Sequence, residues 1–295
     1  MAFTHPDYLV ETEWLADHLD DSSVRILDVT AKLTKELTNR ARGECYDQGH
    51  IPGSVFFDVA AGKGVLSDPD AALPWMWPSP ERFEAVMAEA GVSNDTRVVI
   101  AARTPREGID SGTMWCTRAW WTMHHMGVGC AILRGGIEKW EAEGRPLVSE
   151  PTTPEPATFT STAGWEAARA TKDDVLAAVQ SGGACVVDAL AESSFDGTDP
   201  GYGPRNGHIT GATSVPFRSL VDGETALFPD ADELRSRLGA SRLLEQERII
   251  TYCGGAIAAT VDAFALALFG HEGVAVYDGS LMEWSADDSL PMTGA

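Results

Sequence analysis

The sequence predicts an α/β protein made of two tandem domains, each a parallel β-sheet with helices on both faces. Three observations lead to this prediction. Several motifs recur in the same order in the two halves, short β-branched runs alternate with helical patterns, and a proline- and threonine-rich stretch separates the halves. The chain has 295 residues, which is long enough for two domains that each bury a core of their own.

Four pairs of motifs carry the repeat. The pairs are ILDV with VVDA, which places Asp28 opposite Asp188; GHIPG with GHITG; RVVI with RIIT; and GGIEKW with GSLMEW. The offsets between partners are 160, 158, 151 and 144 residues, so they fall steadily along the chain. Chance seldom preserves four matches in one order, and the falling offsets indicate that the second copy has the shorter connections.

The domain boundaries follow from composition. Residues 149–164, SEPTTPEPATFTSTAG, are rich in proline, threonine and serine and show no apolar period, as expected of an extended linker. We therefore expect a first domain over residues 1–150, a linker over 151–163 and a second domain over 164–295. Each domain is predicted to be an α/β unit of modest size.

Within each copy, strands and helices can be placed from local pattern. The expected strands are residues 24–27, 98–101, 131–133, 185–187, 249–252 and 274–277. Three helices carry end signals: Ser79 as N-cap with Pro80 following and Gly91 as the stop, Thr171 with Gly182, and Asp230 with Glu233 in a capping box. Strands that alternate with helices favour parallel sheets covered on both faces.

Charge and composition exclude several classes of protein. The formal net charge of −22 repels a phosphate backbone, so nucleic-acid binding is not expected. The amino terminus lacks a basic start and a continuous apolar core, and the longest apolar stretch, residues 256–269, is too short to span a bilayer, so we expect neither a signal peptide nor membrane contact. Five cysteines without a C-x-x-C pair argue against disulfides and structural zinc, and they favour a cytoplasmic location.

Cys253 is the residue on which the functional prediction depends. It follows the predicted strand 249–252, where parallel α/β folds bind ligands, and the glycine-rich bend after it leads into a helix-like segment. The backbone amides of Gly254, Gly255, Ala256, Ile257 and Ala258 are expected to surround its sulfur as an anion cradle. Those amides and the helix dipole would lower the pKa of the Cys253 thiol and make it a nucleophile. The alternative is that Cys253 has no chemical role and is a small buried residue that packs at a strand end.

The repeat supplies an internal comparison. The offset of 151 places Ala102 opposite Cys253, so one domain keeps the thiol and the other lacks it. Cys116, Cys130 and Cys185 lie in apolar segments and are expected to pack there, while Cys45 lies in a polar loop without a following helix. Asp188 is expected to support the loop structurally. His50 and His208 occur in both copies, which favours a structural role for them as well.

Taken together, these motifs resemble the two-domain rhodanese and 3-mercaptopyruvate sulfurtransferase family, over nearly the whole chain. The resemblance implies two rhodanese-type domains, of which the second carries the active Cys253. It implies transfer of a sulfane sulfur from a small donor, of the thiosulfate or 3-mercaptopyruvate class, through a Cys253 persulfide to an acceptor such as cyanide or a thiol. No metal or organic cofactor is expected.

The sequence also departs from this family. Thiosulfate-using members carry basic residues in the cysteine loop, whereas this loop has none; in mercaptopyruvate-using members a serine occupies the place of Gly255 and a histidine that of Trp75. The arginines expected after Asp188 are replaced by Leu190 and Ser194. Arg205 is then the candidate for gripping an anionic donor, and Trp75 and Trp77 are candidates for an apolar wall beside the loop.

Two alternatives to a sulfurtransferase enzyme remain open. A non-catalytic or carrier rhodanese module would bind or relay sulfur held on another protein, and the replaced arginines favour it. A cysteine phosphatase would need an arginine six residues beyond the cysteine to bind phosphate oxygens. That position is Ala259, which weakens the phosphatase reading.

Overall fold

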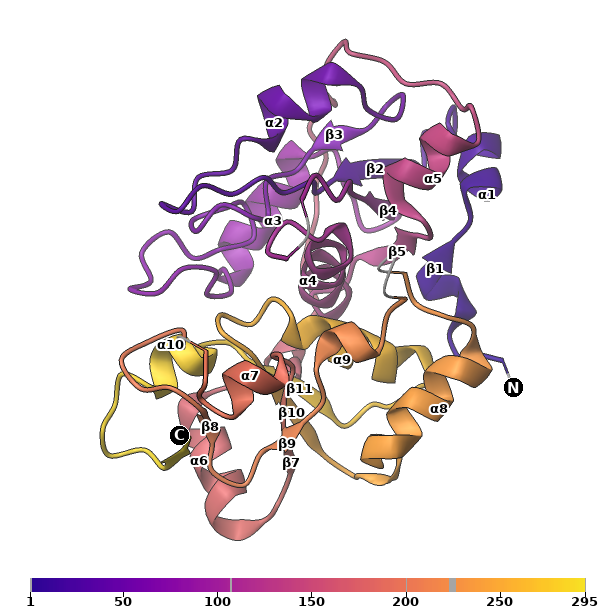
Figure 1. Ribbon diagram of the computed structural model, residues 1–295. Coiled ribbons are helices and arrows are strands. Elements are labelled where there is room, and N and C mark those ends of the chain that lie inside the picture. The colour runs from indigo at the N-terminus through magenta and orange to yellow at the C-terminus, as the bar shows by residue number, and fades with distance from the viewer. Residues whose placement is uncertain (1, 107, 200, 223–226, 295) are drawn as a thin grey trace. The chain divides into compact units, whose positions relative to one another are not determined.

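The computed structural model describes residues 2–106, 108–199, 201–222 and 227–294 of the chain. These residues form two compact units. One unit is Asp7–Gly164, and the other begins at Trp165 and includes the segment that ends at Pro6. Each unit is built on its own five-stranded parallel sheet (Figure 1).

The sheet of the first unit has the strand order β1-β5-β4-β2-β3, and all neighbouring strands run parallel. In Figure 1, α3 and α4 lie on one side of this sheet and α1 and α5 on the other. The elements are β1 (Leu9–Val10), α1 (Thr12–Asp17), β2 (Val24–Asp28), α2 (Ala41–Glu44), β3 (Val55–Phe56), α3 (Pro80–Glu89), β4 (Arg97–Ala101), α4 (Gly112–His125), β5 (Gly129–Leu133) and α5 (Gly136–Ala142).

The second unit repeats this arrangement with the order β6-β11-β10-β7-β9, again parallel throughout. A two-stranded antiparallel pair, β8 with β12, is added to it. The elements are β6 (Arg169–Ala170), α6 (Lys172–Ser181), β7 (Cys185–Asp188), α7 (Glu192–Phe195), β8 (His208–Ile209), β9 (Thr213–Ser214), α8 (Ala231–Ser241), β10 (Ile249–Tyr252), α9 (Ala259–Leu268), β11 (Val274–Tyr277), α10 (Ser280–Trp284) and β12 (Met292–Thr293).

Strand register confirms the internal repeat residue by residue. In the first sheet Asp28 pairs with Ala101, and in the second Asp188 pairs with Tyr252, which reproduces the offsets of 160 and 151. The pairs of β3 with β2 and of β9 with β7 reproduce the offset of 158. The pairs of β1 with β5 and of β6 with β11 reproduce the offset of 144. The two units are therefore duplicates in topology and in register.

The helix ends predicted from sequence are largely confirmed. The Ser79 side chain accepts a hydrogen bond from the Arg82 amide at the start of α3. Thr171 and Asp174 form a reciprocal capping box, and Gly182 ends α6 in the left-handed conformation. Asp230 caps α8 by accepting from the Glu233 amide, but the Glu233 carboxylate bonds to Arg237 instead of completing the box.

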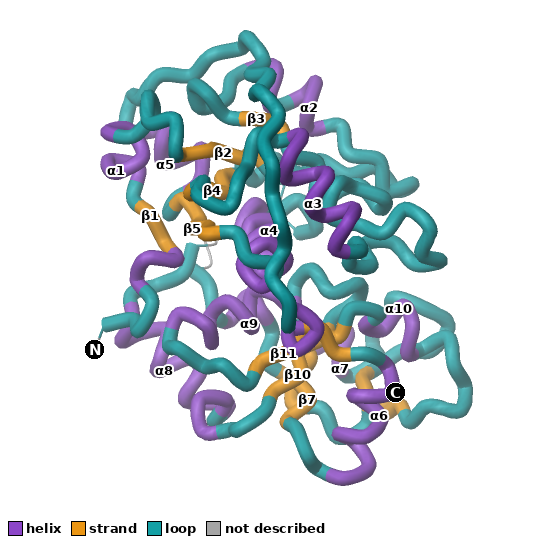
Figure 2. The backbone as a smooth tube through the Cα atoms, turned by 180° about the vertical axis from the view of Figure 1, so that it is seen from behind, coloured by secondary structure: helices purple, strands orange, loops and turns teal. Residues whose placement is uncertain are grey.

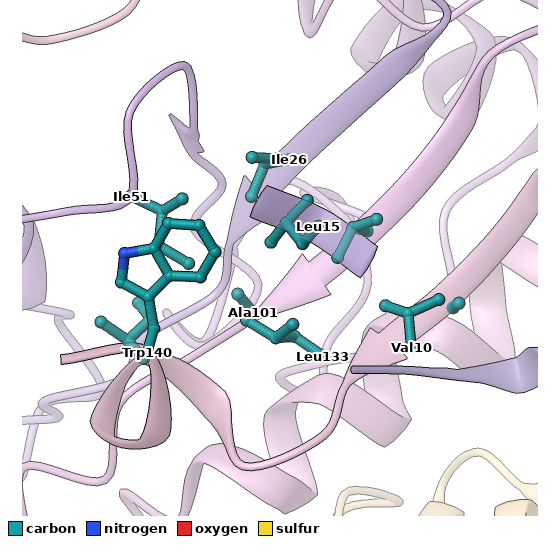
Figure 3. Packing of buried hydrophobic residues seen from close by; sticks show 10 residues of the cluster. Val10, Leu15, Ile26, Ile51, Ala101, Leu133 and Trp140 are labelled. Atoms are coloured by element: carbon teal, nitrogen blue, oxygen red, sulfur yellow. The ribbon is translucent and has the colours of Figure 1, made fainter. Parts of the chain in front are cut away.

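A continuous apolar cluster holds the first unit together. Ten buried residues from strands, helices and loops meet in it (Figure 3), among them Leu15, Ile26, Leu133 and Trp140. Burial of a side chain of this size stabilises the fold by about 1.5–3 kcal/mol relative to an exposed one. The residues of β2, β4 and β5 are buried almost without interruption. Each of these strands therefore appears in the sequence as a short apolar run.

The segment between the two sheets packs on the first unit. Figure 2 shows it as a long loop running beside α4. The Ala157 amide donates to the Ala88 carbonyl of α3, and the Thr162 amide donates to the Met126 carbonyl just after α4. The amino-terminal segment groups with the second unit, where the Thr4 amide donates to the Leu268 carbonyl at the end of α9. No pattern in the sequence indicates this grouping.

Candidate active site

Cys253 lies at the carboxyl end of β10, between the strand and α9. β10 is the central strand of its sheet, paired with β11 on one side and β7 on the other. Five residues, 254–258, separate the cysteine from the first residue of α9. The loop therefore stands at the sheet edge where parallel α/β folds place their ligands, as the sequence predicts.

Backbone amides converge on the Cys253 sulfur. The amides of Gly255, Ile257 and Ala259 hydrogen-bond to it. Gly255 and Ile257 belong to the predicted cradle, whereas Ala259, the first residue of α9, was expected to be outside it. These are alternate residues of the loop, and Ala256, between the first two, adopts a left-handed conformation with φ of +60°. This conformation strains a residue with a Cβ by about 1 kcal/mol.

Ser280 anchors this loop from the neighbouring strand end. Its hydroxyl accepts hydrogen bonds from the Ala256 amide at 3.0 Å and the Cys253 amide at 3.3 Å, and it donates to the Tyr277 carbonyl at 2.8 Å. Ser280 is completely buried and has a φ of +48°. A residue other than glycine in this conformation is uncommon. The strain is offset by three hydrogen bonds that fix the shape of the loop.

The first unit lacks this anchor. The Leu281 amide donates to the Cys253 carbonyl in the second unit, and the Ile137 amide donates to the Ala102 carbonyl in the first. These equivalent bonds confirm that Ala102 stands in the place of the cysteine. Gly136 stands in the place of Ser280 with a φ of +60°, and a Cβ there would approach the Ala102 carbonyl oxygen to 2.6 Å. Only the unit with the thiol has a side chain at this position.

The electrostatic environment corrects one expectation. The pKa of the Cys253 thiol is raised, because burial penalises the thiolate more than the amides of Ala259, Gly255 and Ile257 favour it, and the nearby Asp188 adds to the rise. The sequence-based prediction of a lowered pKa is therefore wrong for the resting thiol. The amides were foreseen, but the side chain is only 3% exposed and has lost most of its contact with water.

This raised pKa predicts how Cys253 will be alkylated. A raised pKa leaves less thiolate at neutral pH than an ordinary cysteine has, so the iodoacetamide rate at Cys253 should still be rising at pH 9. Peptide mapping by mass spectrometry after timed labelling, with Cys253→Ser as the blank, measures this rate. A plateau below pH 8 would mean that the amides outweigh burial after all.

Two buried carboxyl groups lie close to the loop. The pKa of Asp188 is raised to about 6 by burial, against the lowering effects of the Leu190 amide and the Tyr252 hydroxyl. The Leu190 amide donates to Asp188 Oδ1 at 2.9 Å, so Asp188 supports the turn after β7. Asp262 on α9 is completely buried with neither carboxyl oxygen hydrogen-bonded, and burial holds its pKa well above the ordinary value. Burial therefore favours the protonated form of Asp262.

Arg205 is held by backbone carbonyls. Its guanidinium donates to the carbonyls of Trp284 and Leu290 at 2.8 Å, of Ser285 at 2.9 Å and of Asp287 at 2.5 Å. These bonds close the carboxyl end of α10 onto the segment after it. They favour a structural role for Arg205 over the donor-binding role expected from the sequence.

Trp75 and Trp77 are nearly completely buried and belong to the first unit. The Trp75 indole donates to the Ala60 carbonyl at 2.9 Å. The Arg118 guanidinium bonds the Trp75 carbonyl and lies 5.8 Å from the centre of the Trp77 ring. These contacts fix both indoles by local packing, and their contact with a sulfur donor stays a prediction.

The histidines and the other cysteines lie as a structural role requires. His50 stacks on Tyr46 and bonds its carbonyl, and His208 does the same with Phe195. Cys116 and Cys130 are buried, while Cys45 and Cys185 are half-buried. Within the described residues, no three histidine, cysteine, aspartate or glutamate side chains are grouped to hold a metal ion. No helix in the same described ranges is long and apolar enough to cross a membrane.

Two residues near the thiol were not predicted. Ser280 lies within the repeated motif GSLMEW, and its exchange for Gly136 in the other copy was a signal that the two copies differ there. Tyr202 lies with its ring against Gly254. Nothing in the surrounding sequence DPGYGPRNGHI indicates that contact, because it joins residues 52 positions apart.

Fold and site together define a class of protein in which one duplicated α/β domain presents a cysteine thiol to a ring of backbone amides. A model of the rhodanese-like domain matches residues 11–143 and 171–287. The chain belongs to the rhodanese family, and it is a sulfurtransferase.

Individual relatives support this assignment. Thiosulfate sulfurtransferase of Rattus norvegicus is 34% identical over 94% of this chain and 91% of its own. The crystal structure of the 3-mercaptopyruvate sulfotransferase SseA from Escherichia coli superposes with a TM-score of 0.78 and 31% identity, covering 92% of this chain and 98% of that one. The sulfur carrier protein TtuD of Thermus thermophilus is 31% identical over 99% of this chain and 98% of its own.

Proposed function

We propose that this sulfurtransferase works through a persulfide on Cys253. A small donor of the thiosulfate or 3-mercaptopyruvate class supplies the sulfur, and a thiophilic acceptor such as cyanide or a thiol removes it. The observation that carries the proposal is the convergence of the Gly255, Ile257 and Ala259 amides on the one cysteine that the first unit replaces by Ala102. Amides aimed at a sulfur stabilise negative charge on it in either state of the cycle.

The loading step depends on the donor. With thiosulfate, the Cys253 thiolate attacks the outer sulfur, the sulfur–sulfur bond of the donor breaks, and sulfite leaves with the electron pair. With 3-mercaptopyruvate, the carbon–sulfur bond breaks and the released carbon takes a proton, which gives pyruvate. Both routes leave one additional sulfur on Cys253.

The unloading step restores the thiolate. Cyanide attacks the terminal sulfur of the persulfide, the new sulfur–sulfur bond breaks, and thiocyanate leaves. The charge sits on the terminal sulfur before this step and on the cysteine sulfur after it. Backbone amides arranged around the loop can donate hydrogen bonds to the sulfur at either position without moving, which keeps the cost of reorganisation low.

Intact-protein mass spectrometry tests the persulfide. After incubation with thiosulfate or 3-mercaptopyruvate, the mass should rise by one sulfur atom, about 32 Da, and fall again when cyanide is added. Peptide mapping should place the sulfur on Cys253, and Cys253→Ser should gain nothing. A wild-type protein that takes up no sulfur from either donor, or takes it up on another cysteine, contradicts the proposal.

A sulfur carrier is the second candidate. It is supported by the likeness to TtuD and by the Arg205 guanidinium, which is occupied by backbone carbonyls instead of facing the loop. In this case Cys253 would load from a persulfide on a partner protein and turn over small donors poorly. Comparing the rate of loading from a persulfidated protein with that from thiosulfate separates the two candidates. The five free cysteines suit a reducing compartment, and we propose the cytoplasm for either role.

A further inference from the structure

Tyr202 covers the residue next to the reacting cysteine. A Cβ built on Gly254 would meet three atoms of the Tyr202 ring at 2.2, 2.5 and 2.5 Å. The ring therefore lies directly on the Gly254 backbone. Tyr202 is nevertheless 44% exposed, whereas Cys253 is 3% exposed. Tyr202 is thus partly open to solvent while its ring lies against the residue that follows the thiol.

This contact explains the glycine at position 254. Gly254 does not adopt a positive φ, so the backbone alone would accept another residue here. The Tyr202 ring is what excludes a side chain, because no Cβ atom tolerates a neighbour at 2.2 Å. A basic side chain directly after the cysteine cannot coexist with the ring in this position. The ring takes the space from which such a side chain would reach a donor.

The titratable groups that act on the Tyr202 phenol, Cys253 and Asp188, carry no positive charge for a small dianion. Burial raises the pKa of the Tyr202 phenol, and the nearby Cys253 and Asp188 raise it further. The phenol is therefore neutral at pH 7. Asp188 carries negative charge above about pH 6, and burial holds the pKa of Asp262 well above its ordinary value. The Arg205 guanidinium is held by four carbonyls, and Nδ1 of His208 bonds the Phe195 carbonyl. Neither Asp188 nor Arg205 thus offers an unpaired positive charge to an anionic donor.

We propose that Tyr202 is a specificity-determining residue that selects a sulfur donor with an apolar or aromatic group beside the transferred sulfur. This inference rests on the proposed Cys253 persulfide and names the donor class for it. The donor's group stacks on or packs against the exposed part of the Tyr202 ring, which places its outer sulfur next to Cys253. Aromatic pairs contribute about 0.5–1.5 kcal/mol beyond the area that they bury.

Arenethiosulfonates are the probe for this class. Cys253 loses its proton to solvent, the thiolate attacks the outer sulfur of benzenethiosulfonate, the donor's sulfur–sulfur bond breaks, and benzenesulfinate leaves with the electron pair. The negative charge of the thiolate passes to the terminal sulfur of the new persulfide, so atoms and charge balance. Methanethiosulfonate has the same charge and reacting group without the ring, and thiosulfate has a second negative charge.

The test measures kcat/KM for these three donors with cyanide as acceptor. Wild-type protein should prefer benzenethiosulfonate over methanethiosulfonate by about tenfold, as one aromatic contact allows. Tyr202→Ala should reduce that ratio to about one, while Tyr202→Phe should keep it, because the ring and not the hydroxyl makes the contact. Ile109→Ala removes the other exposed large apolar side chain of the described residues, in the other unit, and should leave the ratio as it is.

A double-mutant cycle tests the contact itself. Gly254→Ala should displace the ring and lower the ratio as Tyr202→Ala does, and the double variant should lower it no further, because residues in contact are not additive. Equal ratios in wild-type protein and Tyr202→Ala overturn the inference even when all donors load Cys253. If no donor loads Cys253 in wild-type protein, the proposed function itself fails.

Discussion

Cys253→Ser is expected to lower the rate of thiocyanate formation by at least about 10³-fold while the fold stays intact. A hydroxyl at this position can neither attack a sulfane sulfur usefully nor hold a persulfide. The substitution changes a buried side chain by one atom, so the loop and its hydrogen bonds should persist. The rate is measured with saturating donor and cyanide, and the fold by circular dichroism and thermal unfolding.

The matched control for this variant is Cys45→Ser. Cys45 is a half-buried thiol that lies outside the loop and belongs to the first unit. It should keep the wild-type rate within about twofold, since surface substitutions away from a site change little. If the Cys253→Ser protein were as active as the Cys45→Ser protein, a residue other than Cys253 would have to carry the sulfur.

Ser280→Ala is expected to destabilise the second unit by about 2–4 kcal/mol and to slow sulfur transfer at least about tenfold. The change leaves the Cys253 and Ala256 amides without their acceptor in a buried site, and each such loss costs about 1–3 kcal/mol. The loop that aims the amides at the sulfur would relax. Thermal unfolding gives the stability, and hydrogen exchange of peptides covering residues 253–258 shows whether the loop opens.

Two further variants separate the hydroxyl from the backbone conformation. Ser280→Gly also removes the hydroxyl but relieves the left-handed strain, by about 1 kcal/mol. It should recover part of the stability and none of the activity. Ser285→Ala removes a buried serine hydroxyl that bonds nothing in the described structure, and both readouts should stay near wild type. Full activity in Ser280→Ala would show that Ser280 does not position the loop.

The raised pKa of Cys253 sets the conditions under which the amides act. Burial disfavours the thiolate in the resting protein, and the hydrogen bonds from Gly255, Ile257 and Ala259 offset part of that cost. Asp188 adds repulsion once it ionises near pH 6, and burial holds the pKa of Asp262 well above its ordinary value. The site thus depends on backbone dipoles, and it gains little from charged side chains close to the sulfur.

Much of the fold could be predicted from the sequence because its signals are local. The apolar runs of β2, β4, β7 and β10 mark strands buried on both faces, and Ser79 and Thr171 mark helix starts through bonds to residues three positions on. The short edge strands, such as β1 and β3, escaped prediction. Two residues carry too little pattern, and their pairing with a distant strand defines them.

The repeat and the position of Cys253 after a predicted strand were enough to single out, from the sequence alone, the cysteine on which the backbone amides converge and the unit that carries it. Periodicity and motif order are properties of the sequence itself, so they can be recognised without the tertiary structure. Only the tertiary structure decided the raised pKa of the thiol, the Ser280 anchor and the Tyr202 ring on Gly254. Each of these arises from groups brought together over 24 to 65 residues of chain, and burial and contact exist only after that approach.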